Sequence, residues 1–483
     1  AANAISLYGS RLAPVREKPN IDRLGKEGAV LHNCHCTNSI CTPSRATILT
    51  GQYSHTNGVK TLKDALDKKK NTCPRMLREN GYNTALVGKW HLQSQPQGFD
   101  YYDILPGQGV YFDPEFIDHN IEWTDLGGSP GGDFGYPKER KRNRGYSVDL
   151  ITDKCLEWLE NRDDDNPFML MCQFKAPHGP WQYHPRYENL FHNIDIPEPD
   201  SLWEDKSHRS AGSRDFGRTI DSMIKSFSNP KHPTGAVDFD GLSETEQRQL
   251  AYQKYLKDYL RVIKGIDDNV GRLLDYLDEK GLRDNTIVVY TSDQGMFLGE
   301  HNYNDKRWIF EEALQMPFLI RYPEEIAPGG EVNELVNNVD FAPTLLDYAG
   351  LDAPEEMEGR SFREVVKGNP PADWTNQLYY RYWMHLPPAF PAHYGLRTKE
   401  YKLIFFYGFP LDAAGAASEK TPAAWELYDL KQDPNELKNV YEDRSYANVI
   451  KELKQKLFSL KNEIVDTDKQ YPELVKRVEE TII

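Results

Sequence analysis

Cysteine, proline and arginine stand at alternate positions in one short segment, as Cys41, Pro43 and Arg45. Thr42 is suited to cap a helix, Pro43 to occupy its first position and Gly51 to end it, which predicts a short helix that begins just after Cys41. A sulfur at the positive end of a helix is favoured as a thiolate, and the free backbone N–H groups there bind anions. The segment therefore predicts a reactive cysteine beside an anion site, or else a cysteine that is only packed before a capped helix.

Polar side chains follow three predicted buried strands, at 82–87, 168–174 and 286–290. The residues delivered by these strand ends are Lys89, His91, Lys175, His178, Asp293 and Gln294. Ligands of open α/β sheets bind outside the carboxyl ends of the strands. Each side chain alone is as well explained by an ordinary loop residue with ordinary hydrogen bonds. Together they predict a site for an anion and a metal ion.

Helices and strands alternate along the first three quarters of the chain. The predicted helices are 73–80, 147–162 and a long one from 243, with a capping box at Ser243 and Glu246, to Gly281. This alternation predicts an α/β fold with a large, mostly parallel sheet between helices. Short antiparallel strands at 377–382, 393–397, 401–407 and 425–430, followed by a helix at 446–464, predict a smaller C-terminal subdomain. We place the boundary between 1–365 and 366–483.

Composition narrows the possible partners of the chain. Its 483 residues contain 58 Lys and Arg against 74 Asp and Glu, so an acidic net charge of −16 argues against nucleic-acid binding. No apolar run approaches the ~18 residues of a membrane span. Six cysteines are too few for a disulfide scaffold. The first ten residues lack a charged region and an apolar region, so we expect no signal peptide in the chain as given.

The cysteine segment, continued by Ala46 and by Thr50-Gly51, resembles the nucleophile signature of the sulfatase family, whose fold is alkaline-phosphatase-like. The segment 81–92, which contains Gly88-Lys89-Trp90-His91, resembles the second signature of that family. The segment 291–307, with Ser292-Asp293-Gln294-Gly295 and Asp305-Lys306-Arg307, resembles its metal and sulfate segment. The similarity runs from about Tyr8 to Tyr322, and bacterial polysaccharide sulfatases are the most similar members.

The resemblance implies a role for each matching residue. Cys41 would be oxidised to formylglycine by a formylglycine-generating enzyme, and the hydrated aldehyde would attack sulfur with one hydroxyl and expel sulfate through the other. Arg45 and Lys89 would hold this diol, and His91 would be the base for its second hydroxyl. His178 and Lys306 would bind the sulfate and assist the leaving oxygen. The ligands of a calcium ion would include Asp293, Gln294 and the group derived from Cys41.

Two features depart from the family pattern. Members usually supply two further metal-binding aspartates from the end of a first strand, which would precede Ala1, so we expect a catalytic region 1–365 that lacks its first strand and part of its metal site. Truncation is the expected reason, because the other site residues are present. The second departure is Gln294, where Asn is common; the longer amide keeps the carbonyl donor.

The C-terminal region offers two candidate substrate contacts, His393 and Arg397, because loops of this subdomain approach the substrate in the family. The alternative is that both residues hold the subdomain in place.

The sequence predicts a sulfuric ester hydrolase that removes sulfate from a sulfated carbohydrate. One alternative is a phosphate or phosphonate ester hydrolase of the same superfamily. Another is a non-catalytic binder of sulfated glycans, which would follow from an incomplete metal site. The resemblance suggests a periplasmic or secreted protein.

Overall fold

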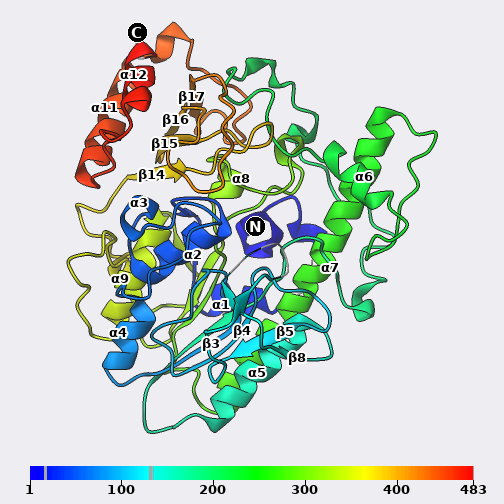
Figure 1. The fold of residues 1–483 in the computed structure, drawn as a ribbon, viewed down its shortest axis with the longest axis vertical. Helices are drawn as coiled ribbons and strands as arrows, with labels where there is room; N and C mark the ends of the chain where they lie inside the picture. The colour runs from blue at the N-terminus through cyan, green and yellow to red at the C-terminus, as the bar shows by residue number, and fades with distance from the viewer. Residues whose placement is uncertain (16–18, 130–132, 134, 482–483) are drawn as a thin grey trace.

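A computed structural model describes residues 1–15, 19–129, 133 and 135–481 of the chain. The first 365 residues contain two main sheets with helices around them (Figure 1). The larger sheet has the spatial order β8 (Lys141–Arg142), β5 (Glu115–Asp118), β4 (Tyr101–Leu105), β3 (Asn83–Lys89) and β9 (Phe168–Gln173). Its central strand β3 runs parallel to both β4 and β9, whereas β5 is antiparallel to β4 and β8.

The second sheet has the order β10 (Val288–Thr291), β11 (Phe318–Arg321), β1 (Ala29–Leu31) and β12 (Gly330–Val332). Strand β11 is antiparallel to β10 and β1, and β1 is parallel to β12. The α/β class is thus confirmed, with the strands divided between two sheets rather than joined in one. Strands β9 and β10 are end strands of these sheets, and both are half-buried along their whole length.

Helices lie on two sides of the sheets (Figure 1). On one side, α5 (Ser147–Asn161) packs against α7 (Glu244–Glu279), which begins with the predicted capping box of Ser243 and Glu246. On the other side lie α2 (Cys41–Thr50), α3 (Ser54–Asn57), α4 (Cys73–Glu79) and α9 (Phe341–Tyr348). Shorter helices are α1 (Ile21–Glu27), α6 (Ile224–Phe227), α8 (Glu311–Leu314) and α10 (Arg363–Val366). Two-residue strands form the pairs β2 (Cys34–His35) with β13 (Val336–Asn337), and β6 (Leu126–Gly127) with β7 (Tyr136–Pro137).

The C-terminal part is the predicted antiparallel sheet with helices. Its order is β14 (Gln377–Tyr382), β15 (His393–Thr398), β16 (Tyr401–Phe406) and β17 (Ala424–Asp429). Helices α11 (Ala447–Glu463) and α12 (Pro472–Glu480) pack on one face of this sheet. The other face shares an aromatic core with the segment around Trp308. The division of the chain at residue 365 stays a prediction.

The fold brings chemically active residues to one place because several elements end there. Strand β3 ends at Lys89, the loop after β9 carries Lys175, and the loop after β10 carries Asp293. Helix α2 begins at Cys41. Among the residues that the structure describes, no helix is long and apolar enough to cross a membrane.

Candidate active site

Cys41 is the first residue of α2, and Ile40 before it has extended backbone. The helix ends at Gly51, whose positive φ of 62° is the left-handed conformation that glycine adopts at little cost. The helix begins two residues before the predicted first position at Pro43, and Thr42 does not cap it. Its hydroxyl instead donates a hydrogen bond to the carbonyl oxygen of His91 over 3.0 Å. The nucleophile segment and the second signature are thereby held together.

The surroundings of Cys41 favour a negative charge, although its side chain is buried, with only 2% of the residue exposed. Burial alone would raise the pKa of the thiol. The ammonium groups of Lys306 and Lys89 and the nearby imidazole of His91 outweigh burial and lower this pKa to about 5. Cys41 and Asp305 in turn raise the pKa of Lys306 against the effect of its own burial. Any anion at this place meets two fixed positive charges.

Arg45 connects three parts of the site. Its Nε donates to Oδ2 of Asp293 over 3.0 Å, and its Nη1 donates to the carbonyl oxygen of Lys89 over 2.7 Å and to the amide oxygen of Gln173. Burial would raise the pKa of Asp293, but Arg45, Lys89 and Lys306 lower it to about 2. Asp293 is therefore ionised at neutral pH.

His91 lies in the left-handed backbone region, with φ 56°, and is completely buried. Its Nε2 is 3.1 Å from a carboxylate oxygen of Asp133. A carboxylate only accepts hydrogen bonds, so we assign the imidazole proton to Nε2, which leaves Nδ1 as the basic nitrogen. Burial opposes ionisation of Asp133, yet the hydrogen bond with His91 lowers the pKa of this carboxyl.

His178 and Lys175 come from the loop after β9. The Nδ1 of His178 donates to the carbonyl oxygen of Gly179 over 3.0 Å, which leaves Nε2 as an acceptor. Burial, together with the charges of Lys306 and Lys89, holds the pKa of His178 well below its usual range. The same causes, burial first, lower the pKa of Lys175 to about 7. The pKa values of Lys175 and His178 are therefore lowered by the positive charges of Lys89 and Lys306 nearby.

Two oxygen donors stand where a cation is expected. The carboxylate of Asp293 is ionised, and the side-chain oxygen Oε1 of Gln294 is buried without a hydrogen-bond partner. A buried amide oxygen without a partner is costly, and a hard cation would satisfy it. Within the described ranges no cluster of three or more His, Cys, Asp and Glu side chains is suited to a metal. These residues fit part of a calcium coordination sphere.

The structure does not place His393 and Arg397 with the other site residues. His393 is completely buried, and its ring lies against those of Trp308, Tyr380 and Phe406. Arg397 pairs with the carboxylate of Glu311, with Nε 3.3 Å from Oε1. These contacts favour the alternative that both residues hold the C-terminal sheet against the rest of the chain, and their role in substrate binding stays a prediction.

Residues that the sequence did not assign also belong to this site. Asp133 and Gln173 gave no signal, since one lies in an irregular Gly-rich segment and the other inside a strand. Lys175 did give a signal, as a cation directly after a strand, but it received no role. Asn338 also supports the site: its amide donates to the hydroxyl of Ser44 over 2.8 Å, and that hydroxyl donates to the carbonyl oxygen of Asp293.

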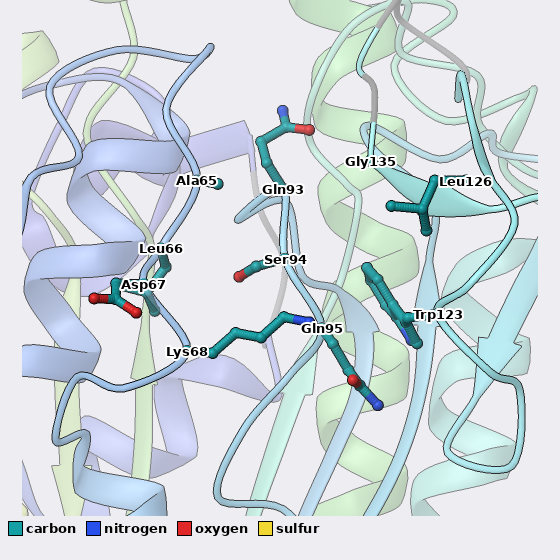
Figure 2. Close-up of a pocket in the computed structure, with 10 residues that line it drawn as sticks. All are labelled: Ala65, Leu66, Asp67, Lys68, Gln93, Ser94, Gln95, Trp123, Leu126 and Gly135. Atoms are coloured by element: carbon teal, nitrogen blue, oxygen red, sulfur yellow. The ribbon is translucent and has the colours of Figure 1, made fainter.

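A cavity of about 330 Å³ lies beside the loop that carries His91. Figure 2 shows the cavity, with Lys68 on one side, Trp123 and Leu126 on the other, and the segment 93–95 between them. Its volume is within the usual range for a small-molecule site. Gln93, on the cavity wall, is two residues from His91.

Comparisons with known proteins agree with this geometry. Residues 2–351 match the sulfatase family model, and residues 299–463 match the model of the C-terminal region of N-sulphoglucosamine sulphohydrolase. An N-acetylglucosamine-6-O-sulfatase of Bacteroides thetaiotaomicron is 38% identical over 98% of this chain and 86% of that protein. A solved structure in complex with its substrate D-glucosamine-2-N,6-O-disulfate has a TM-score of 0.85 and 36% identity, covering 98% of this chain and 97% of the other.

A phosphonate monoester hydrolase of Silicibacter pomeroyi has a TM-score of 0.68 and 21% identity, over 96% of this chain and 94% of the other, and this likeness concerns the fold alone. The long match to the family model and the near full-length relative decide the family. The chain belongs to the sulfatase family and is a sulfuric ester hydrolase.

Proposed function

We propose that the protein removes the 6-O-sulfate from a glucosamine residue of a sulfated glycan, with Cys41 oxidised to formylglycine as the nucleophile. The observation that carries the proposal is the position of Cys41 at the start of α2, among Lys89, Lys306 and His91. Formylglycine supplies, as its hydrated aldehyde, an oxygen nucleophile and a second hydroxyl that allows sulfate to leave. A formylglycine-generating enzyme is the implied maturation partner.

Some side chains of this site bind the sulfate group, and others transfer protons. Lys89 and Lys306 place positive charge where the sulfate oxygens gain negative charge. Arg45 fixes the position of Lys89 through its backbone carbonyl. His91 is the base, through Nδ1, while Asp133 holds the ring in place through Nε2.

His178 and Lys306 serve the departing oxygen. His178 is neutral in the free site, because the surrounding ammonium groups and burial disfavour its charge. A bound sulfate ester offsets those charges, so it favours protonation of His178 at Nε2. Lys306 contributes a fixed charge to the same oxygen.

Calcium is the expected metal, held by Asp293, Gln294 and the oxygen group derived from Cys41. The support is the ionised carboxylate and the unpartnered amide oxygen of Gln294. When bound, the ion would add positive charge for the sulfate oxygens.

The substrate assignment draws on two similar proteins and on the cavity. One relative is named as an N-acetylglucosamine-6-O-sulfatase, and the structure with a TM-score of 0.85 holds a 2-N,6-O-disulfated glucosamine. The cavity beside segment 93–95 offers the aromatic ring of Trp123 and the polar side chains of Gln95 and Lys68. Aromatic surfaces with a few polar groups are typical of sites that bind sugar rings. A periplasmic or secreted location stays a prediction from the family.

The test is sulfate release from a matched set of substrates by protein co-expressed with a formylglycine-generating enzyme. We expect N-acetylglucosamine 6-sulfate to be hydrolysed at least about tenfold faster than galactosamine 4-sulfate or 6-sulfate, a difference of about 1.4 kcal/mol. An aryl phosphate and an aryl phosphonate ester are the controls for the alternative chemistry. Higher kcat/KM on the phosphorus esters, or binding of sulfated glycan without turnover by calcium-loaded protein, would contradict the proposal.

A further inference from the structure

Asp305 is a single carboxylate shared by three cations. Its Oδ2 accepts a hydrogen bond from Nη1 of Arg218 over 3.0 Å and lies 3.7 Å from Nε of Arg307. Its Oδ1 lies 3.6 Å from Nζ of Lys306. Lys306 also faces Cys41 and serves the ester to be cleaved, which leaves the carboxylate of Asp305 to be shared by the two arginines. The arginine pair therefore retains an excess of positive charge that an additional anion would neutralise.

The backbone around Lys306 is held in an uncommon conformation. Asp305 has φ 74° and Arg307 has φ 87°, and neither residue is glycine. Residues other than glycine rarely adopt a positive φ. They keep it only where the surrounding structure fixes them, most often at functional sites. Two backbone hydrogen bonds fix this turn: Phe297 N–H donates to the carbonyl oxygen of Asp305, and Asn304 N–H donates to that of Arg218, both over 2.9 Å.

The guanidinium of Arg307 is only partly used by the protein. Its Nη1 donates to the hydroxyl of Tyr382 over 3.4 Å, and its Nε is buried without a hydrogen-bond partner. The ring of Phe390 lies 5.1 Å from the guanidinium of Arg307 and 5.5 Å from that of Arg218. Both cations are thus aligned along one aromatic side chain from the C-terminal part of the chain.

The side chains of the two arginines differ in their exposure to solvent. The side chain of Arg307 is 11% exposed, and that of Arg218 is 53% exposed. Arg307 forms the inner end of the pair and Arg218 the outer end. The inner end is near the nucleophile: burial would lower the pKa of Arg307, but Tyr382, Asp305 and Cys41 hold it above its usual value.

We propose that Arg307 and Arg218 form a second anion site, which binds an additional negatively charged group of the substrate while the ester to be cleaved lies at Cys41. Guanidinium groups bind sulfate, sulfamate and carboxylate oxygens through paired hydrogen bonds, and the site takes groups of this class. Because Arg307 follows Lys306 directly and lies near Cys41, the second group is on the same sugar or on its neighbour. The inference rests on the proposed function and adds selectivity for doubly charged substrates.

The first experiment compares substrates that differ by one charge. Purified enzyme is assayed with N-acetylglucosamine 6-sulfate, glucosamine 2-N,6-O-disulfate, and a disaccharide in which the 6-sulfated glucosamine is joined to a uronic acid. We expect Arg307→Gln to reduce the ratio of kcat/KM for one or both doubly charged substrates to that for the singly charged one by at least about tenfold. Arg218→Gln should reduce it less, because Arg218 is more exposed. The substrate whose ratio falls identifies whether sulfamate or carboxylate is bound.

A matched control is Arg214→Gln, in the same segment as Arg218 and 46% exposed, with its own ion pair to Asp215 at 3.0 Å. This variant should leave the ratio unchanged. An unchanged ratio in both Arg307→Gln and Arg218→Gln would overturn the second anion site while leaving the sulfatase assignment intact.

The second experiment does not depend on turnover. Binding of the same three sugars to the Cys41→Ala protein is measured by calorimetry, with and without Arg307→Gln and Arg218→Gln. We expect an arginine substitution added to Cys41→Ala to weaken binding of a doubly charged sugar at least about tenfold more than binding of the singly charged one. Equal weakening for all three sugars would refute the second anion site even if no sulfatase activity were found.

Discussion

The Nε of Arg45 donates a hydrogen bond to a carboxylate oxygen of Asp293 over 3.0 Å, although the two residues are 248 positions apart in the chain. Arg45 lies in α2, which begins at Cys41, and Asp293 lies in the loop after β10. The nucleophile helix and the carboxylate proposed for calcium are therefore held as one unit. The charge of Arg45 also keeps Asp293 ionised.

Replacement of Arg45 by lysine keeps the charge but loses the fork of donors. A single ammonium cannot reach Asp293, the carbonyl of Lys89 and the amide of Gln173 together. We expect Arg45→Lys to lower kcat/KM by about 10²-fold, the scale of losing one preorganised electrostatic partner. The control is Arg75→Lys on α4, whose guanidinium contacts a backbone carbonyl of Lys69 over 3.2 Å. If Arg45→Lys kept kcat/KM within threefold of the wild-type value, Arg45 would not be needed to hold the nucleophile helix and Asp293 together.

Replacement of Lys306 tests whether its charge takes part in the reaction. It could belong to a solvated run of charges, but it is only 5% exposed. Charge grows on the departing oxygen in the transition state, so a fixed cation there acts more on turnover than on substrate binding. We expect Lys306→Ala to lower kcat by about 10²-fold or more, with a smaller change in KM. Steady-state kinetics on a sulfate ester decide this, with exposed Lys280→Ala as control; near-normal kcat would remove Lys306 from the reaction.

Lys175 makes the affinity for sulfate depend on pH. Burial and the charges of Lys89 and Lys306 lower its pKa to about 7, so it is cationic below that pH and neutral above it. A cation attracts the product anion, and the inhibition constant of inorganic sulfate should therefore rise as pH increases from 6 to 8.5. Asp293, with a pKa of about 2, stays ionised throughout. Lys175→Met should flatten the profile, whereas a wild-type profile that is flat or falls with pH would disprove this role.

Replacement of Trp123 tests whether the glycan binds in the cavity beside segment 93–95. Its ring is half-buried on the cavity wall and lies 5.9 Å from that of Tyr136. Loss of an aromatic contact with a sugar is worth about 1 kcal/mol, so we expect Trp123→Ala to raise KM for a sulfated oligosaccharide about fivefold to tenfold. KM for a small aryl sulfate should change much less. Trp203→Ala, at an exposed tryptophan, is the control; equal effects on both substrates would argue against a sugar contact.

The fold and the core of the site could be predicted because they depend on local patterns. A buried strand followed by Lys89 or Asp293 identifies a strand end, and the proline and glycine around α2 identify its bounds. Asp133 could not be predicted, because its partner His91 is 42 positions away and its own segment has no periodicity. The partner of Arg397 could not be predicted for a related reason: the pattern predicts its strand, whereas its contact with Glu311 depends on how the C-terminal sheet packs.

The most direct test of the account is the chemical state of Cys41 together with activity. Protein made with and without a formylglycine-generating enzyme is digested, and the peptide that contains Cys41 is weighed by mass spectrometry while sulfate release is assayed on the same samples. The account predicts that activity rises in proportion to the fraction of formylglycine, and that Cys41→Ala abolishes it. Full activity with an unmodified thiol, or undiminished activity in Cys41→Ala, would contradict it.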